Sequence, residues 1–364
     1  MSIKTGIVGL PNVGKSTLFN VLTESEIEAE NYPFCTIDPN HGMVKVHEPR
    51  LIKINQLIPS EKITHSFLEF VDIAGLVKGA SLGEGLGNQF LSNIRNVDAI
   101  IHVVRCFDDE NVTHVEKTIS PLRDIEIINT ELLLKDLDTI SKRIKKIDKT
   151  VKSGNKEFKA EYDLLNLLVD KLNEGILIKN IDLTEDQILL LKSISPLTLK
   201  PTLYLANIDE NGISKSNHHL DALNGWANEN EELVLTICTK FEAEMIGLNQ
   251  QEKEEFLNSY GLSKTGADRL SSAAFDLLGM ETFFTAGEKE IKSWPIKKGT
   301  RASEAAGVIH SDIQRGFIKA EVYSFNNLIH YKTEENLKAS GKIRQEGKSY
   351  IVKDGDIIFF KFNV

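Results

Sequence analysis

The sequence predicts an α/β fold with a parallel central sheet, interrupted by a helical insertion and followed by a small strand-rich domain. Short apolar runs alternate with stretches of helical spacing through most of the chain, and this alternation is typical of strands joined by crossover helices. One long segment instead repeats apolar residues every three or four positions, as coiled-coil helices do. The composition changes again near residue 281.

The central sheet is predicted from apolar runs of strand length, each bounded by turn residues. The runs are Lys4–Leu10, Phe67–Ile73, Ala99–Val104, Leu203–Ala206 and Leu233–Ile237. A glycine-rich turn and the helical spacing of Lys15–Thr23 follow the first run. Ligands of parallel sheets bind at the carboxyl ends of the strands, so the residues after each run are the first candidates for a site.

The helical insertion is predicted to be an antiparallel hairpin spanning residues 123–197. It would divide the nucleotide-binding domain into residues 1–122 and 198–280. Helical spacing stops at the Ser-Gly-Asn turn of residues 153–155 and resumes over residues 165–172, before Gly175. The preceding heptad seam consists of Leu133, Leu137, Ile140, Ile144, Ile147 and Val151.

Residues 281–364 are predicted to form the separate C-terminal domain. Its apolar runs are short and punctuated by glycines, as is typical of a small sheet with tight turns. The runs are Phe317–Val322, Tyr350–Val352 and Ile357–Phe360, and the glycines are Gly341, Gly347 and Gly355.

Composition excludes several classes of protein. The 364 residues are 41% hydrophobic and 26% charged, which is ordinary for globular chains and unlike disordered ones. The net charge of −10 argues against a protein that coats nucleic acid with its whole surface. No apolar run is long enough to cross a bilayer. Three isolated cysteines, Cys35, Cys106 and Cys238, favour a reducing cytoplasm. We therefore expect a cytoplasmic protein, and neither a membrane nor DNA as a partner.

A phosphate-binding loop is predicted at Gly9–Ser16. Its sequence GLPNVGKS matches G-x-x-x-x-G-K-[ST] and lies between a predicted strand and a predicted helix, which is the context that the motif requires. The backbone amides of Val13 to Thr17 can point at phosphate oxygens at the positive end of the helix dipole. Lys15 is predicted to reach the β- and γ-phosphates, and Ser16 to offer its hydroxyl to Mg²⁺.

Further magnesium ligands are predicted from the D-x-x-G motif Asp72–Gly75. Asp72 would hold Mg²⁺ through a water, and the Gly75 amide would sense the γ-phosphate. Thr36, in the polar loop between the two motifs, is the candidate for the second hydroxyl ligand. The glycine-rich residues 79–87 would then act as a switch.

The base-reading segment is predicted to be Asn207–Glu210, directly after a strand. A guanine reader has the form N-K-x-D, and the chain contains no such motif; here isoleucine replaces lysine and Glu210 replaces aspartate. The longer glutamate displaces the carboxylate from the geometry of a bidentate contact with guanine. These residues favour ATP over GTP. The residues expected to line the base are Asn207, pairing with the adenine edge, Ile208, Phe107 and Cys238 in the loop after the next strand.

The residue after D-x-x-G is Leu76, where a water-orienting glutamine often stands. Slow intrinsic hydrolysis is therefore expected, with the water positioned from elsewhere. His114, in a polar loop, is the candidate for this role; the alternative is an ordinary surface histidine. Asn12 could help to hold a monovalent cation, K⁺, against the phosphates.

The order of these motifs resembles a translation-factor-type G domain of the P-loop NTPases. Residues 31–40, 72–91 and 102–107 (NYPFCTIDPN, DIAGLVKGASLGEGLGNQFL and HVVRCF) resemble the YchF branch of the Obg-like ATPases, and residues 306–322 resemble a TGS domain, a β-grasp module. The resemblance covers essentially the whole chain. It implies an Mg²⁺-dependent ATPase that associates with ribosomes, through the large subunit or ribosomal RNA. Leucine at position 76 is also the pattern of the Obg-like group.

The residues by themselves are compatible with more than one binding partner and more than one activity. The hairpin tip is rich in basic side chains, which form either a solvated helix face or a contact for phosphate backbone. Three alternatives to the ATPase are a nucleotide-gated ribosome- or RNA-binding module with incidental hydrolysis, a GTPase, and a kinase of small substrates. The kinase would need an arginine-rich lid, which the sequence lacks. We expect a monomer. The tip residues are Lys142, Arg143, Lys145, Lys146, Lys149, Lys152, Lys156 and Lys159.

Overall fold

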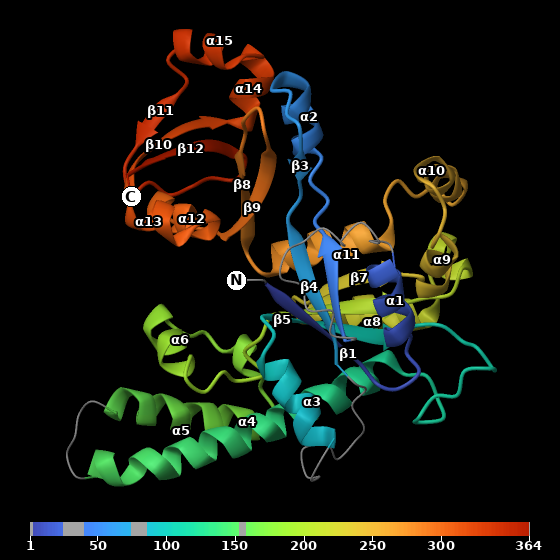
Figure 1. The fold of residues 1–364 in the computed structure, drawn as a ribbon. Coiled ribbons are helices and arrows are strands. Elements are labelled where there is room, and N and C mark those ends of the chain that lie inside the picture. Colours follow the sequence, from blue (N-terminus) through green and yellow to red (C-terminus); the bar gives the residue numbers. More distant parts are fainter. Residues whose placement is uncertain (1–2, 25–39, 74–85, 153–157, 364) are drawn as a thin grey trace. The chain divides into compact units, whose positions relative to one another are not determined.

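The computed structural model describes residues 3–24, 40–73, 86–152 and 158–363 (Figure 1). It divides into two compact units, each of which is described by itself. The first unit contains Ile3–Gly42 and Glu69–Ala267, and the second contains Met43–Leu68 and Asp268–Val364.

The first unit is built on a six-stranded sheet with the order β2-β4-β1-β5-β6-β7. β1 pairs in parallel with β4 and β5, β5 with β6, and β6 with β7, which confirms the predicted parallel sheet. Every residue of β5 is buried, because helices cover both faces of such a sheet. The strands are β1 (Lys4–Val8), β2 (His41–Lys45), β4 (Phe67–Asp72), β5 (Ala99–Arg105), β6 (Thr202–Asn207) and β7 (Leu233–Ile237).

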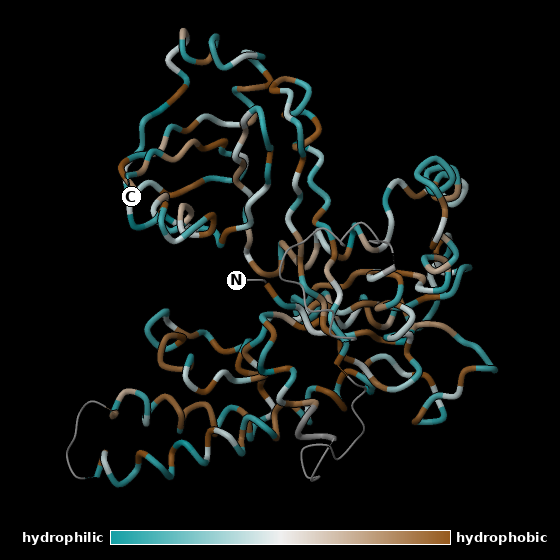
Figure 2. Tube along the Cα trace, in the orientation of Figure 1, coloured by the Kyte–Doolittle hydropathy of each residue, from teal (hydrophilic) through white to brown (hydrophobic). Residues whose placement is uncertain are grey.

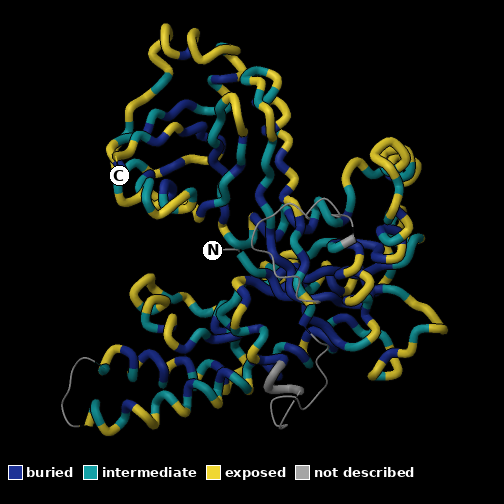
Figure 3. The backbone as a smooth tube through the Cα atoms, viewed as in Figure 1, coloured by how far each residue is buried: buried dark blue, intermediate teal, exposed yellow. Residues whose placement is uncertain are grey.

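Helices follow the strands of this sheet, as the alternating pattern predicts. The strands β1, β4, β5 and β6 contain many hydrophobic residues (Figure 2) and are largely buried (Figure 3). Among the described residues, no helix combines the length and the apolar composition that crossing a membrane requires. The helices are α1 (Lys15–Glu24), α3 (Leu86–Arg95), α7 (Asn211–Ser214), α8 (His218–Glu229), α9 (Thr239–Glu244) and α10 (Gln250–Ser259). The helix α11 (Gly266–Leu277) begins at the end of this unit, and most of its residues belong to the second unit.

The predicted hairpin consists of α4 (Pro121–Lys152) and α5 (Lys159–Asn173), which lie side by side and antiparallel in Figure 1. The heptad seam is confirmed from Leu133 to Ile147, because these five of its six residues pack in one cluster with Leu165 and Leu168 of α5. The Ser-Gly-Asn turn lies outside the described residues. The short elements η2 (Ile178–Asn180) and α6 (Glu185–Leu191) lead back towards β6.

A buried carboxylate attaches the hairpin to the chain that returns to the sheet. Asp136 of α4 accepts hydrogen bonds from the backbone amides of Leu197 and Thr198 and from the Thr198 hydroxyl, each at 2.8 Å. Burial raises the pKa of Asp136, and these three hydrogen bonds oppose that shift because they favour the ionised form.

The second unit is built on a sheet with the strand order β11-β10-β12-β8-β9-β3. β8 and β9 form an antiparallel hairpin, α12 follows, and β12 returns parallel to β8. This is the β-grasp arrangement that the resemblance implies. The strands are β3 (Ile63–Thr64), β8 (Met280–Thr285), β9 (Ile291–Lys297), β10 (Phe317–Ser324), β11 (Arg344–Glu346) and β12 (Asp356–Phe362), and the helices are α2 (Arg50–Leu57), α12 (Ala302–Ile309), α13 (Ser311–Arg315), α14 (Phe325–Tyr331) and α15 (Glu334–Ala339).

Two features of this unit differ from the prediction. Residues 43–68 were assigned to the first domain, but Leu51 and Ile54 of α2 pack in one core cluster with Phe284 of β8, and β3 pairs with β9. Such contacts join segments more than 200 residues apart, and no local pattern encodes them. The run Tyr350–Val352 is also not a strand, since only Ile351 forms an isolated bridge, with Arg301.

Candidate functional site

The loop between β1 and α1 requires unusual backbone geometry. Gly14 has φ +100°, and a Cβ atom there would lie 2.2 Å from Asn207 Nδ2, so only glycine fits. Asn12 also has a positive φ, of 61°, a conformation that asparagine tolerates better than most residues. Val13 is buried, whereas Ser16 and Thr17 are exposed in the first turn of α1. The predicted phosphate loop is thus a tight turn leading into a helix.

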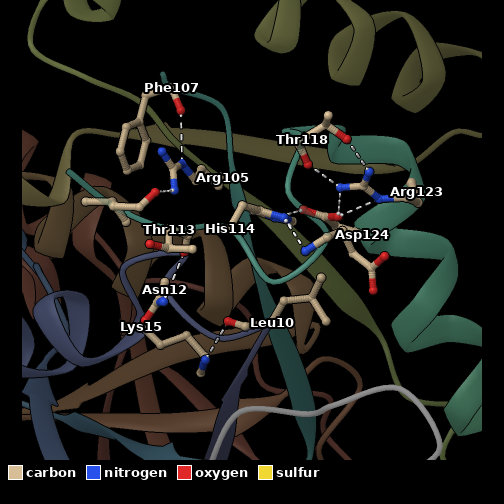
Figure 4. A network of polar contacts seen from close by, with 12 residues as sticks. Leu10, Asn12, Lys15, Arg105, Phe107, Thr113, His114, Thr118, Arg123 and Asp124 are labelled. Carbon is tan, nitrogen blue, oxygen red and sulfur yellow. Dashed lines mark hydrogen bonds and ion pairs between the residues drawn. The ribbon is translucent and has the colours of Figure 1, made fainter. Parts of the chain in front are cut away.

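Lys15 and Asp72 are the charged groups of this site. Lys15 is buried, and its ammonium donates to the Leu10 carbonyl at 2.8 Å (Figure 4). Burial lowers the pKa of Lys15, and the negative charge of Asp72 opposes this. Burial likewise raises the pKa of Asp72, and Lys15 opposes that shift. Each group therefore stabilises the charged form of the other inside a poorly solvated site.

The donor set fits a magnesium-bound nucleotide. Asp72 Oδ1 is buried, and no hydrogen-bond partner for it is present among the described residues. An orphaned carboxylate oxygen costs free energy unless it meets a cation or a water, and oxygen ligands are those that Mg²⁺ prefers. The exposed Ser16 hydroxyl is the second candidate ligand. Thr36, Gly75, Leu76 and the start of the glycine-rich stretch 79–87 lie outside the described residues.

Asn207 has a structural role that the sequence did not predict. Its side-chain Nδ2 donates to the Val13 carbonyl at 2.9 Å, and its Oδ1 accepts from the Thr239 amide at 3.1 Å. The amide thus joins the phosphate loop to the loop after β7. One proton on Nδ2 and one lone pair on Oδ1 remain for a base, so the predicted pairing with adenine is still a hypothesis.

Two other predicted base contacts are corrected by the structure. Ile208 is only 4% exposed and packs in the core with Leu223 and Phe241, so it offers little surface for a base ring. Cys238 is buried as well, and its sulfur accepts from the Phe241 amide as the N-cap of α9. Burial raises the pKa of the Cys238 thiol. Glu210, by contrast, is half-exposed and lies 2.8 Å from Lys240 Nζ.

Phe107 begins a loop that a buried arginine holds in place. Arg105, at the end of β5, donates from Nε to the Phe107 carbonyl at 3.0 Å, from Nη1 to Val112 at 2.7 Å and from Nη2 to Asp109 at 3.1 Å. The guanidinium also lies 4.6 Å from the Phe107 ring centroid (Figure 4). Three carbonyls on one rigid fork fix residues 107–112. The sequence signal for this role is an arginine that ends a fully buried strand.

His114 is buried, which contradicts the alternative that it is an ordinary surface histidine; its role at the attacking water stays a prediction. Its side chain is 2% exposed, with Nε2 2.8 Å from Asp124 Oδ2. The Glu116 amide donates to Nδ1 at 3.1 Å, so Nδ1 carries no proton and Nε2 is the donor to Asp124. Arg123 binds the other carboxylate oxygen of Asp124 at 3.0 Å (Figure 4). Both ring nitrogens are occupied in this conformation, and neither can orient a water.

Asn12 connects the phosphate loop to the segment that carries His114. Its side-chain amide donates to the Thr113 carbonyl at 3.0 Å (Figure 4). The structure therefore places the phosphate loop, the 107–114 loop and the beginning of α4 in one continuous set of polar contacts. Asp124, in the first turn of α4, also belongs to this set, and the sequence did not predict it. A single acidic residue in the first turn of a helix is common, because its negative charge interacts favourably with the helix dipole.

Comparison with known proteins covers the whole chain. Residues 4–136 match the family model described as 50S ribosome-binding GTPase, and residues 280–363 match the YchF-GTPase C-terminal model, described as a protein of unknown function. The ribosome-binding ATPase YchF of Escherichia coli O157:H7 is 48% identical over 364 residues and that of Bacillus subtilis (strain 168) 46% over 366, with all of both chains covered in each comparison.

Comparison with a solved structure also indicates a YchF protein. The Schizosaccharomyces pombe YchF GTPase superimposes with a TM-score of 0.90 at 36% identity, covering 99% of this chain and 98% of the other. Identity of this level over complete chains, with the fold and the phosphate loop in agreement, places this chain in the YchF family.

Proposed function

We propose that this protein hydrolyses ATP with Mg²⁺ and uses the nucleotide state to control its association with the ribosome. The observation that carries the proposal is the orphaned Asp72 oxygen beside buried Lys15, at the carboxyl end of the sheet. The names of the relatives support it: those from Escherichia coli and Bacillus subtilis are called ribosome-binding ATPases. The Schizosaccharomyces pombe protein is described as a GTPase, so the names of the relatives do not decide between ATP and GTP.

Each residue of the site would have its own role in phosphoryl transfer. The Lys15 ammonium would leave the Leu10 carbonyl for the β- and γ-phosphate oxygens and stabilise the charge that develops on them. The amides of the first turn of α1 would hold the same oxygens. Ser16 and Asp72 would hold Mg²⁺, which neutralises phosphate charge. The carbonyl oxygen of the Asn12 side chain is the group proposed to contact K⁺, since its nitrogen is bound to Thr113.

The preference for ATP rests on Glu210. Guanine readers use an aspartate that accepts two hydrogen bonds from the base, and here the acid is one methylene longer and paired with Lys240 at 2.8 Å. A carboxylate that is one methylene longer and paired with a lysine gives guanine no special advantage.

Shortening Glu210 should therefore move selectivity towards GTP. We expect Glu210→Asp to raise the affinity for GTP relative to ATP by about tenfold, the value of one good bidentate contact to a base. Calorimetry with Mg²⁺ present measures both dissociation constants. Lys240→Ala is the matched control, because it breaks the same ion pair and leaves Glu210 in place. An unchanged ratio in Glu210→Asp, or an equal change in both variants, would show that the base is not read at this position.

His114 is proposed to position the attacking water after release from Asp124. His114→Ala should then lower kcat while the ATP dissociation constant changes little, as expected for a group that acts only in the transition state. Asp124→Asn, which weakens the pair but keeps the imidazole, should retain more activity than His114→Ala. Single-turnover hydrolysis and equilibrium nucleotide binding test this. If kcat is the same in His114→Ala as in the parent, the residue serves only to hold the loop.

The ribosome contact is proposed to lie at the tip of the hairpin. Several tip residues are already paired: Arg143 lies 2.6 Å from Glu161, and Lys142, Lys152 and Lys159 face aspartates one turn away. Lys156 lies outside the described residues. Within the described part of the chain, no ion pair involves Lys145, Lys146 or Lys149, and all three are exposed. These three are the side chains available to RNA phosphates.

Reversing their charge should weaken ribosome association without changing ATP affinity. We expect the triple variant Lys145→Glu, Lys146→Glu, Lys149→Glu to bind at least about tenfold more weakly at low salt, since counterion release scales with the number of phosphates contacted. Co-sedimentation at two salt concentrations measures the effect. The control makes the same charge change at the exposed residues Lys192, Lys215 and Lys264. Equal pelleting of both variants would identify the tip as a solvated helix face.

A second function is favoured by the state of His114. Because its imidazole is buried against Asp124, hydrolysis by the free protein would be slow, and the nucleotide would then act chiefly as a gate for ribosome binding. Turnover with and without ribosomes separates the two functions. Strong stimulation supports a ribosome-activated ATPase, whereas ribosome binding that depends on ATP without increased turnover supports the gated binder.

A further inference from the structure

Three metal-ligating side chains lie together beside the loop that begins at Phe107. They are Asp108 of this loop and the adjacent His218 and His219 at the start of α8, and their ligand atoms all lie within 4.8 Å of one another. We propose that these residues bind a divalent transition-metal ion of the Zn²⁺ or Co²⁺ type. The proposal does not rest on the proposed function, because none of the three belongs to the phosphate site.

The geometry suits an ion of this size. His219 Nε2 lies 3.3 Å from Asp108 Oδ1, which is close to the separation of two ligands on one tetrahedral zinc, each about 2 Å from the metal. The two imidazole rings are 3.8 Å apart between centroids and tilted by 39°. Asp108 has a side chain 74% exposed and His218 is also exposed, so both can rotate to close the remaining distance.

Partly buried hydrogen bonds hold the backbone on both sides of the cluster. Arg105 binds the carbonyls of Phe107 and Asp109, the two neighbours of Asp108. Asn217 caps α8 by accepting from the Leu220 amide at 2.9 Å, and its Nδ2 donates to the Cys106 carbonyl at 2.8 Å. The same asparagine thus ties the helix start to the end of β5. Ligands on a backbone fixed in this way lose little freedom on binding.

The ligand chemistry selects the class of metal. Two imidazoles and one carboxylate suit zinc, cobalt or nickel, whereas Mg²⁺ prefers oxygen ligands alone. His219 is buried, with a side chain 9% exposed, and provides the poorly hydrated wall of the site. The positive end of the α8 dipole disfavours a cation, so the affinity should be moderate rather than that of a structural zinc. A bound ion would join the 107–114 loop to α8.

Metal binding by the complete, nucleotide-free protein, after treatment with a chelator, tests the proposal. Calorimetric titration with Zn²⁺ should give one site per chain, and Co²⁺ should produce visible absorption bands of a histidine-ligated ion. His218→Ala and Asp108→Asn should each weaken Zn²⁺ binding by about tenfold or more. Both positions are exposed, so the variants should fold. His330→Ala removes another exposed histidine and is the control that should bind as the parent does.

Thermal unfolding provides a readout that does not depend on activity. Zn²⁺ should raise the Tm of the parent and of His330→Ala, because a ligand that binds only the folded chain stabilises it. It should raise the Tm of His218→Ala and Asp108→Asn much less. The proposal is overturned if the parent binds no Zn²⁺, or if the parent, His218→Ala and Asp108→Asn bind it with the same affinity and stoichiometry.

Discussion

Lys15→Ala should lower the rate of ATP hydrolysis by at least about a hundredfold, the usual effect of removing one preorganised donor to developing charge. Within the described part of the chain the Lys15 ammonium donates one hydrogen bond, to the Leu10 carbonyl, and burial already lowers its pKa. Removing it should therefore cost little folding free energy. Steady-state phosphate release and thermal unfolding, measured on the same preparation, separate loss of catalysis from loss of structure.

The control for this prediction is Lys142→Ala, which removes an exposed lysine of the hairpin paired with Asp138. It should hydrolyse ATP at the parental rate. Normal turnover in Lys15→Ala would refute the assignment of residues 9–16 as the catalytic phosphate loop. A large fall in Tm together with lost activity would instead indicate that Lys15 supports the fold.

The largest effect on stability is expected at Asp136. Asp136→Ala leaves the amides of Leu197 and Thr198 and the Thr198 hydroxyl without their acceptor in a buried position. The free energy of unfolding should fall by about 3 kcal/mol or more, since each buried donor without a partner costs about 1 kcal/mol or more. Urea-induced unfolding followed by circular dichroism measures the change.

Asp138→Ala provides the comparison on the same helix. Asp138 is exposed and makes one pair with Lys142, one helical turn away, so its removal should change the free energy of unfolding by less than about 0.5 kcal/mol. Equal destabilisation by the two variants would mean that the contacts of Asp136 with residues 197–198 do not hold the hairpin to the returning chain.

Local sequence patterns were sufficient to predict those features whose structure and chemistry depend on residues adjacent in the chain. The phosphate loop could be predicted because its glycines, Lys15 and the helix that follows are contiguous, and the same residues supply both the turn and the chemistry. The heptad seam of α4 could be predicted because helical periodicity is a property of one segment. The parallel sheet followed from apolar runs such as 99–104, which is buried on both faces.

Tertiary structure decided what depends on groups far apart in the chain. Sequence analysis placed Asn207, Ile208 and His114 at the nucleotide. In the fold, Asn207 bonds Val13 and Thr239 and keeps one proton and one lone pair for a base, whereas Ile208 packs in the core and His114 pairs with Asp124. An amide, an aliphatic side chain or an imidazole can contact either a ligand or another residue of the protein. The residues that the fold places next to it determine which contact it makes. Residues 43–68 joined the distant β-grasp sheet for the same reason: the pairing of β3 with β9 satisfies backbone groups that no local signal reveals.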